Sequence, residues 1–321
     1  KRGDPEGARK ALERFLQPGQ FSMRTYRGQV RYAEALAKEG RALDAADFLG
    51  SSLDALEEWR SGLDAVGLQR YAFQVAEYVP DPDLGVASVL AALAGSGQAR
   101  RAFNLAERQR ARDLYEKMVL AEIGRRGEGE DLDEDPSIPG PARPLGAGEI
   151  LEAIPDNRTA LIEFVTGTGG EPTTAFILAG AQVDAVVLPS VDSMERDINL
   201  LRSLAESDED PEAVATRLGE SLLEPILRGL PEGISSLVLV PSGSLHRIPF
   251  DLLAPTDEGP LLKRFAVSLA PSASVVARLW AEGDQARAGF LALGNPELTG
   301  PGAEGLPRLP GAEKEARAVV R

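Results

Sequence analysis

SSLVLVPSGSLHRIPFDLLA, residues 235–254, is the stretch from which the fold can be worked out. Leu237–Val240 are consecutive apolar residues followed by Pro241–Ser244, the pattern of a short strand buried on both faces and stopped by turn residues. Leu245–Phe250 then lead into Asp251–Leu253, which predicts a helical turn with a proline near its start. A buried strand that runs through a glycine-containing loop into a helix is half of an α/β crossover unit.

The composition excludes several kinds of chemistry. The 321 residues include 35 Lys and Arg against 50 Asp and Glu, so the net charge of −15 disfavours nucleic acid and anionic lipid as partners. Cysteine is absent, which excludes disulfides, thiolate metal sites and a cysteine nucleophile within this sequence. His246 is the single histidine, so we expect no histidine-based metal site and no cofactor. No apolar run is long enough to span a membrane, and we expect a cytoplasmic protein.

Residues 1–124 are predicted to be helical, because they are rich in Ala, Leu, Glu and Arg and carry almost no strand signal. A weak repeat places an alanine five residues after a glycine, in the pairs Gly3/Ala8, Gly40/Ala45 and Gly97/Ala102. In two copies a leucine, Leu36 or Leu93, stands four residues before the glycine. We interpret the pattern as helical hairpins, in which glycine turns the chain and alanine permits close packing. The copies are unequally spaced, so an irregular helical bundle is the alternative.

The clearest helix of this half is predicted at Ala99–Ile123. Its apolar residues recur at helical spacing and predict a buried stripe formed by Phe103, Ala106, Leu114 and Met118. Glu107 and Arg110 are three residues apart, and we expect them to pair on the surface. A phosphate or acidic-peptide site is the alternative for the arginines, but the neighbouring carboxylates favour a solvated, self-neutralised face.

Residues 125–148 differ sharply in composition from both flanks. A run of carboxylates between Glu128 and Asp135 is followed by several prolines, so this segment cannot form a core and is interpreted as an exposed, mobile linker. A calcium loop is the alternative, but the acidic residues lack the required order of ligands and glycine.

Residues 149–321 are predicted to form a mixed sheet with helices on its faces. Strands are expected at Thr159–Thr166, Thr174–Leu178, Gln182–Leu188, Leu237–Val240, Leu261–Leu269 and Gly289–Leu293. Helices are expected at Glu149–Ile154, Asp192–Glu206, Glu212–Leu227, Ser272–Glu282 and Gly311–Arg321. In the second of these helices, Leu200, Leu201 and Leu204 are predicted to share one buried side.

No catalytic residue is assigned within the chain. The motif residues singled out are Pro241, Ser242, Gly243, Leu245, His246, Pro249 and Phe250, and we expect their role to be structural. His246 could activate Ser242 or Ser244, but the segment lacks Gly-x-Ser-x-Gly, and a serine so close in sequence to its base rarely has suitable geometry. A phosphate cradle would need the lysine and glycine spacing of a P-loop. Pro249 and Phe250 are interpreted as helix start and core anchor.

VPSGSLHRIPFDLL, residues 240–253, resembles the hallmark of the CHAT family, which comprises caspase-like domains usually found behind tetratricopeptide repeats (TPRs). AFNLAERQRARDLYEKM, residues 102–118, resembles the helix that commonly joins such repeats to a CHAT domain. Further resemblances follow the motif in the expected order, in RFAVSLAPSASVVARL (264–279), LALGNPEL (291–298) and LPRLPGAEKEA (306–316).

The resemblance implies an α + α/β fold, with a TPR-like repeat array at 1–124, the linker at 125–148 and a caspase-like CHAT domain at 149–321 that is incomplete at its C-terminus. The family is similar to caspases and separase in cleaving peptides with a histidine–cysteine dyad. Because its dyad motifs follow the GAEKEA helix, they are expected beyond Arg321. The chain would then be the sensing part of a cysteine endopeptidase, with repeats that bind a protein or peptide. The alternative is a non-enzymatic scaffold with a degenerate protease-like domain.

Overall fold

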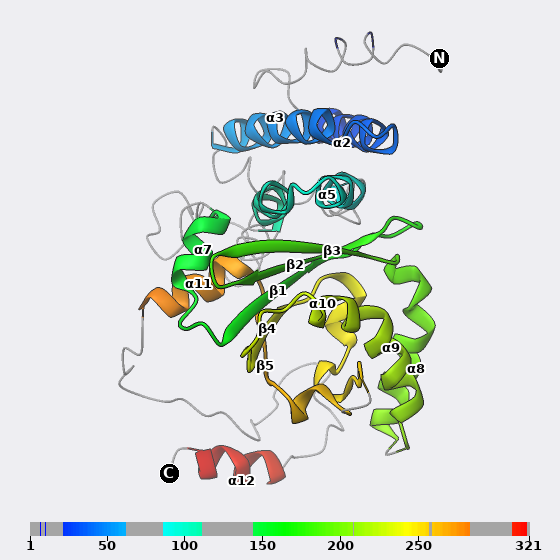
Figure 1. The fold of residues 1–321 in the computed structure, drawn as a ribbon, viewed down its shortest axis with the longest axis vertical. Coiled ribbons are helices and arrows are strands. Elements are labelled where there is room, and N and C mark those ends of the chain that lie inside the picture. Colours follow the sequence, from blue (N-terminus) through cyan, green and yellow to red (C-terminus); the bar gives the residue numbers. More distant parts are fainter. Residues whose placement is uncertain are drawn as a thin grey trace, which may run out of the picture. The chain divides into compact units, whose positions relative to one another are not determined.

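The five described strands form one mixed sheet, in the order β3-β2-β1-β4-β5 (Figure 1). The strands are β1 (Thr159–Val165), β2 (Thr173–Ala179), β3 (Gln182–Leu188), β4 (Ser236–Val240) and β5 (Ala266–Leu269). The first three form antiparallel pairs, whereas β4 pairs in parallel with both β1 and β5. Strand hairpins therefore come first and parallel crossovers follow, which confirms the predicted mixed sheet.

This computed structural model describes residues 7, 10, 22–61, 86–110, 144–207, 209–256, 259–282 and 310–319. The chain divides into two compact units, Lys1–Ala281 and Glu282–Arg321. In the second unit the structure describes a helix, α12 (Pro310–Val319). Among the described helices, none combines the length and apolar character that crossing a membrane requires.

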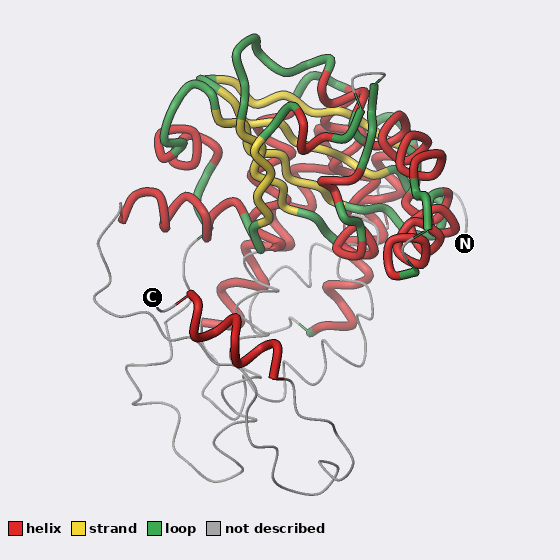
Figure 2. The backbone as a smooth tube through the Cα atoms, turned by 90° about the horizontal axis from the view of Figure 1, so that it is seen from below, coloured by secondary structure: helices red, strands yellow, loops and turns green. Residues whose placement is uncertain are grey.

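Both faces of the sheet are covered by helices (Figure 2), so every residue of β1 is buried. Because side chains alternate along a strand, each strand contributes to two separate cores. One core contains the first-face residues Leu161, Val165, Phe176, Leu178 and Val240. The other contains the second-face residues Ala160, Ile162, Phe164, Ile177 and Leu239.

The second face is covered by α8 (Glu195–Glu206), α9 (Glu212–Leu222) and α10 (Glu224–Leu227), with a short 3-10 turn, η3 (Val191–Ser193), before α8. The single helix predicted at Glu212–Leu227 is broken at Leu223, because Pro225 in the first turn of α10 has no N–H to continue the α-helical ladder. The predicted buried row on α8 is also wrong at Leu200, which is 39% exposed, whereas Leu201 is fully buried.

The first face is covered by helices from the N-terminal half of the chain. The outer layer consists of α2 (Met23–Lys38) and α3 (Ala42–Ser61). The inner layer, next to the sheet, consists of α5 (Val86–Gly95) and the helical residues 99–110 (Figure 1). α7 (Ala147–Ala153) and α11 (Ala273–Glu282) complete this layer, and their buried residues belong to the same core.

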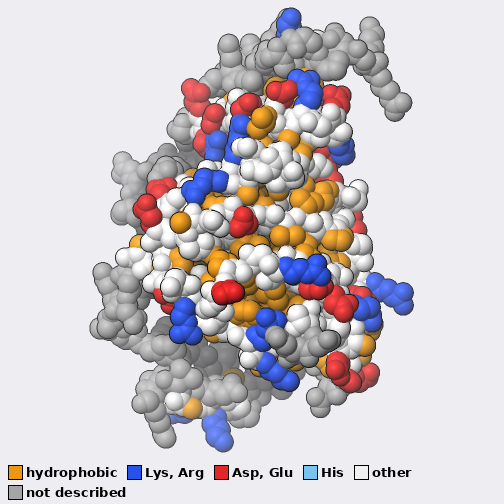
Figure 3. Space-filling model, viewed as in Figure 1, with side chains coloured by type: hydrophobic (Ala, Val, Ile, Leu, Met, Phe, Trp, Pro, Cys, Tyr) orange, Lys and Arg blue, Asp and Glu red, His pale blue; other side chains and the backbone are white. Residues whose placement is uncertain are grey.

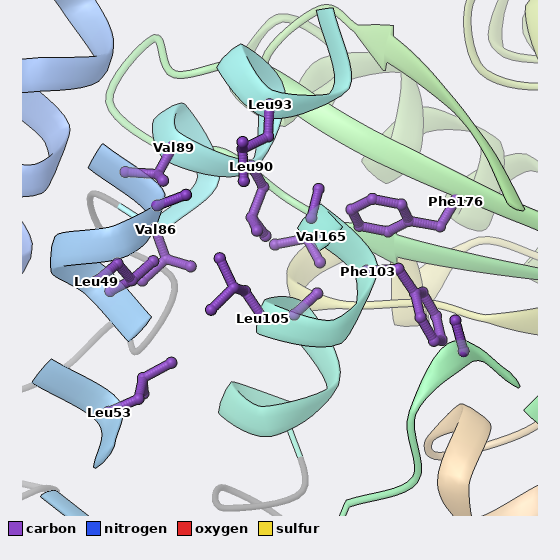
Figure 4. Packing of buried hydrophobic residues seen from close by; sticks show 14 of the residues in the cluster. Leu49, Leu53, Val86, Val89, Leu90, Leu93, Phe103, Leu105, Val165 and Phe176 are labelled. Atoms are coloured by element: carbon purple, nitrogen blue, oxygen red, sulfur yellow. The ribbon is translucent and has the colours of Figure 1, made fainter. Parts of the chain in front are cut away.

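The first-face core passes without interruption from the N-terminal helices into the sheet (Figure 4). Phe103 contacts Phe176 of β2 edge to face, with ring centroids 5.6 Å apart. Leu90 and Leu105 lie beside Val165 of β1 in the same view. The N-terminal helices thus share a continuous core with the sheet.

The glycine–alanine pattern marks two helical hairpins. Gly40 and Gly97 have φ angles of 80° and 77°, the left-handed conformation that ends a helix most readily at glycine. The next residue in each case donates its N–H to the carbonyl of the leucine before the glycine, Arg41 to Leu36 at 3.0 Å and Gln98 to Leu93 at 2.9 Å. These hydrogen bonds confirm the predicted hairpin turns, while a TPR array remains a prediction.

The strand predicted at Leu261–Leu269 is half correct. Leu261–Lys263 form a 3-10 turn, η6, because the Leu261 N–H donates to the Leu253 carbonyl at 2.8 Å and not to a neighbouring strand. The other predicted helices agree closely with α7, α8, α11 and α12. Several predictions lie outside the described residues, namely Gly3/Ala8, Leu114, Met118, the strand at Gly289–Leu293 and most of the linker at 125–148.

Candidate functional site

The motif that follows β4 forms two short 3-10 turns, η4 (Gly243–Arg247) and η5 (Phe250–Leu252). The predicted helical turn with a proline near its start is present as η5, which follows Pro249, but it is a 3-10 turn and not an α-helix. Pro249 explains the difference, because a residue before proline avoids the helical conformation, and Ile248 is extended with φ −84° and ψ 125°. Leu245 and Phe250 are buried on the second face of the sheet, and the Phe250 ring lies 5.9 Å from that of Phe164.

Ser242 joins the carboxyl ends of the parallel strands β1 and β4. Its buried hydroxyl accepts the Thr166 N–H at 2.9 Å and donates to Thr166 Oγ1 at 3.0 Å. Gly243 follows with φ +52°, and a Cβ on it would stand 2.7 Å from Thr166 Oγ1. The serine hydroxyl is thus engaged with Thr166, which favours a structural role over nucleophilic attack.

The motif also contacts α8, through Arg247. Arg247 donates to Glu195 Oε2 at 2.6 Å and to Asn199 Oδ1 at 2.9 Å, both on α8. His246 is exposed, Pro241 is buried and Pro249 is partly buried. The motif therefore anchors β4 to the second-face helices.

Arg110 is a residue that the sequence analysis assigned to the surface, and the structure places it at the strand ends. Its guanidinium donates to the Pro241 carbonyl at 3.0 Å and to the Phe164 carbonyl. Its Nε lies 3.2 Å from Oε1 of Glu163, whose side chain is fully buried on β1. One side chain from the N-terminal helices thus contacts β1 and the residue that follows β4.

Glu107 is also buried, so the predicted surface pair with Arg110 is wrong. Its Oε2 accepts the backbone N–H of Ser274 at 3.0 Å and the Ser274 hydroxyl. Ser274 Oγ in turn accepts the Leu145 N–H at 2.9 Å. The first turn of α11 supplies the donors that replace water around this carboxylate.

Burial raises the pKa of the Glu163 carboxyl well above its ordinary value, and the nearby Glu107 carboxylate raises it further, while Arg110 opposes both. We call Glu107, Arg110, Glu163, Thr166 and Ser242 the strand-end junction. Within the described residues, no group of three or more acidic, histidine or cysteine side chains is arranged to hold a metal ion.

The sequence contained one signal for this junction. Glu163 interrupts the otherwise apolar strand TALIEFV, and a carboxylate in a strand buried on both faces requires a partner. The partner could not be identified from sequence, because Arg110 is on a helix that also presents a row of other arginines.

Residues 212–321 match the family model of the CHAT domain. The matched region begins at α9 and includes β4, the motif, β5, α11 and α12. This match confirms the resemblance to the CHAT family for residues 212–321 and relates this part of the chain to caspase-like proteases. No curated protein matches the chain.

Proposed function

We propose that this chain is the regulatory part of a caspase-like cysteine endopeptidase. In this proposal the N-terminal helices are TPR-like repeats that bind a protein partner and control the CHAT-related sheet. The observation that carries the proposal is the contact of Arg110 with the carbonyls of Phe164 and Pro241.

The location of that contact supports a regulatory role. In open α/β sheets, ligands and reacting groups gather outside the carboxyl ends of the strands. Arg110 bonds to the backbone at this edge, between the parallel strands β1 and β4. A partner that shifts residues 99–110 would therefore disturb the strand ends directly.

The chemistry of cleavage would be thiolate attack on a peptide carbonyl, with histidine as the acid–base group. This sequence has no cysteine, so the proposal assigns the dyad to a segment beyond Arg321. The alternative is a non-enzymatic scaffold, which the absence of cysteine and the engagement of Ser242 with Thr166 also support.

The test is a peptide-cleavage assay on the proposed parent protein, with and without a cysteine-directed inhibitor. We expect inhibitor-sensitive cleavage, and none from residues 1–321 alone. Arg110→Met should raise partner-free cleavage roughly tenfold, equivalent to about 1.4 kcal/mol, because the helices then restrain the strand ends less.

Arg108→Met is the matched control, because Arg108 is on the same helix but pairs with Asp54 and Glu57 at the surface. It should leave cleavage unchanged. A parent protein that cleaves no peptide and reacts with no thiol-directed probe would favour the scaffold. Equal effects of the two arginine variants would remove the proposed route of control.

A further inference from the structure

Three carboxyl oxygens at the strand-end junction have no well-aligned hydrogen-bond donor among the described residues. They are Glu107 Oε1 and both oxygens of Glu163, all without access to solvent. The two carboxyl groups are close enough for the charge of Glu107 to raise the pKa of Glu163. Buried oxygens without donors are costly, and two carboxylates facing each other would add repulsion. A single proton between the two groups would satisfy two of these oxygens and remove the repulsion.

The surroundings show which carboxyl carries that proton. Glu107 accepts two hydrogen bonds from Ser274 in the first turn of α11, and a helix N-terminus favours a negative charge. Glu163 receives no comparable set of donors, and Arg110 Nε, 3.2 Å from its Oε1, is not aligned for a hydrogen bond. The donors that Ser274 supplies to Glu107 therefore favour the proton on Glu163.

We propose that Glu163 is a protonated carboxylic acid that donates to Glu107, and that this proton holds residues 99–110 against the sheet. Loss of the proton at alkaline pH would loosen the N-terminal helices. The inference stands whether or not the parent protein cleaves peptides, because it concerns only how the two layers are held together.

The charge balance explains the direction of the effect. With the proton present, the cluster contains one carboxylate and one guanidinium and is neutral; without it, a buried negative charge is uncompensated. The pKa of Glu163 is raised in the folded protein, so its stabilising effect is complete below the ordinary pKa of a glutamate. That effect is lost as the pH rises through the raised value.

The groups that face Glu163 are few in the described structure. Residues 99–110 contribute Glu107 and Arg110, and α11 contributes the backbone N–H of Ala273. Ser274, also on α11, contacts Glu107.

The first test is thermal unfolding of Glu163→Gln between neutral and alkaline pH. Glutamine reproduces the size and neutrality of the acid and has no proton to lose, so we expect a Tm at pH 7 equal to or above that of the unmodified chain. The fall in Tm at alkaline pH should be largely absent in this variant. Glu224→Gln is the control, because Glu224 pairs with Arg228 at the surface, and its pH profile should follow that of the unmodified chain.

An ionised Glu163 would give the opposite result. Glu163→Gln would then remove the counter-charge of Arg110, lower the Tm at pH 7 sharply and leave the alkaline slope unchanged. Either outcome, a sharp loss at pH 7 or an unchanged slope, would overturn the proposal.

Infrared spectroscopy of the unmodified chain tests the protonation state directly and does not depend on a variant that folds. We expect the carbonyl stretch of a protonated carboxyl group at pH 7, and its loss in alkali together with faster amide exchange in residues 99–110, after correction for intrinsic rates. Absence of the band at pH 7 would overturn the proposal.

Discussion

At the scale of single residues, the motif separates into side chains that pack and one that is exposed. Phe250 is 2% exposed and lies against Phe164, whereas His246 is exposed. We expect Phe250→Ala to lower the free energy of unfolding by about 3–5 kcal/mol, because it leaves a cavity in the second-face core. His246→Ala should change it by less than about 0.5 kcal/mol. Urea titrations of both variants measure the difference, and similar losses would mean that Phe250 is not a core anchor.

The sequence could predict Phe250 but not Glu107, and the reason is physical. The local pattern around the motif was enough to predict Phe250 as a core anchor, and its side chain is buried. Glu107 looked like an ordinary surface carboxylate, and its burial depends on Ser274, 167 residues further along the chain. Local pattern carries no information about a donor that tertiary folding supplies.

At the scale of elements, α9 approaches the chain after the motif more closely than a side chain would allow. A Cβ on Gly219 would stand 2.7 Å from the backbone at Ala254 and Pro255, whereas one on Gly95 in α5 would meet nothing within 4 Å. At a helical position, alanine is normally more favourable than glycine by about 1 kcal/mol. We therefore expect Gly95→Ala to be neutral or stabilising, but Gly219→Ala to cost about 1–3 kcal/mol through overpacking.

Equilibrium unfolding of the two alanine variants checks this prediction. Equal effects at the two positions would contradict the close approach of α9 to residues 254–255.

Elements with a regular apolar period were predictable, and those set by a proline or a distant contact were not. β1 and β3 agree with their predicted ranges to within one residue, and both hairpin turns occur at the predicted glycines. The break before α10 and the 3-10 turns of the motif follow from Pro225 and Pro249, whose effect on element type was underestimated.

At the scale of the whole molecule, the sequence could not show what the N-terminal helices cover. Their apolar stripes look the same whether they pack on one another or on a sheet. The structure places Phe103 against Phe176 and Arg110 on the ends of β1 and β4. The domain boundaries at 124 and 149 remain a prediction. Charged side chains of both signs are interspersed over the face seen in Figure 3, with apolar side chains between them.

The central claim is that the N-terminal helices and the sheet share one core and unfold together. The chain has two tryptophans, Trp59 in α3 and Trp280 in α11, and both are partly buried against that core. Trp280→Phe leaves a reporter in the outer helical layer, and Trp59→Phe leaves one beside the sheet. Urea unfolding of each variant is monitored by tryptophan fluorescence and by circular dichroism. We expect the fluorescence midpoint to coincide with the circular dichroism midpoint in both variants. Separate transitions, with the Trp59 reporter unfolding while the Trp280 reporter stays native, would contradict the shared core and favour two independent domains.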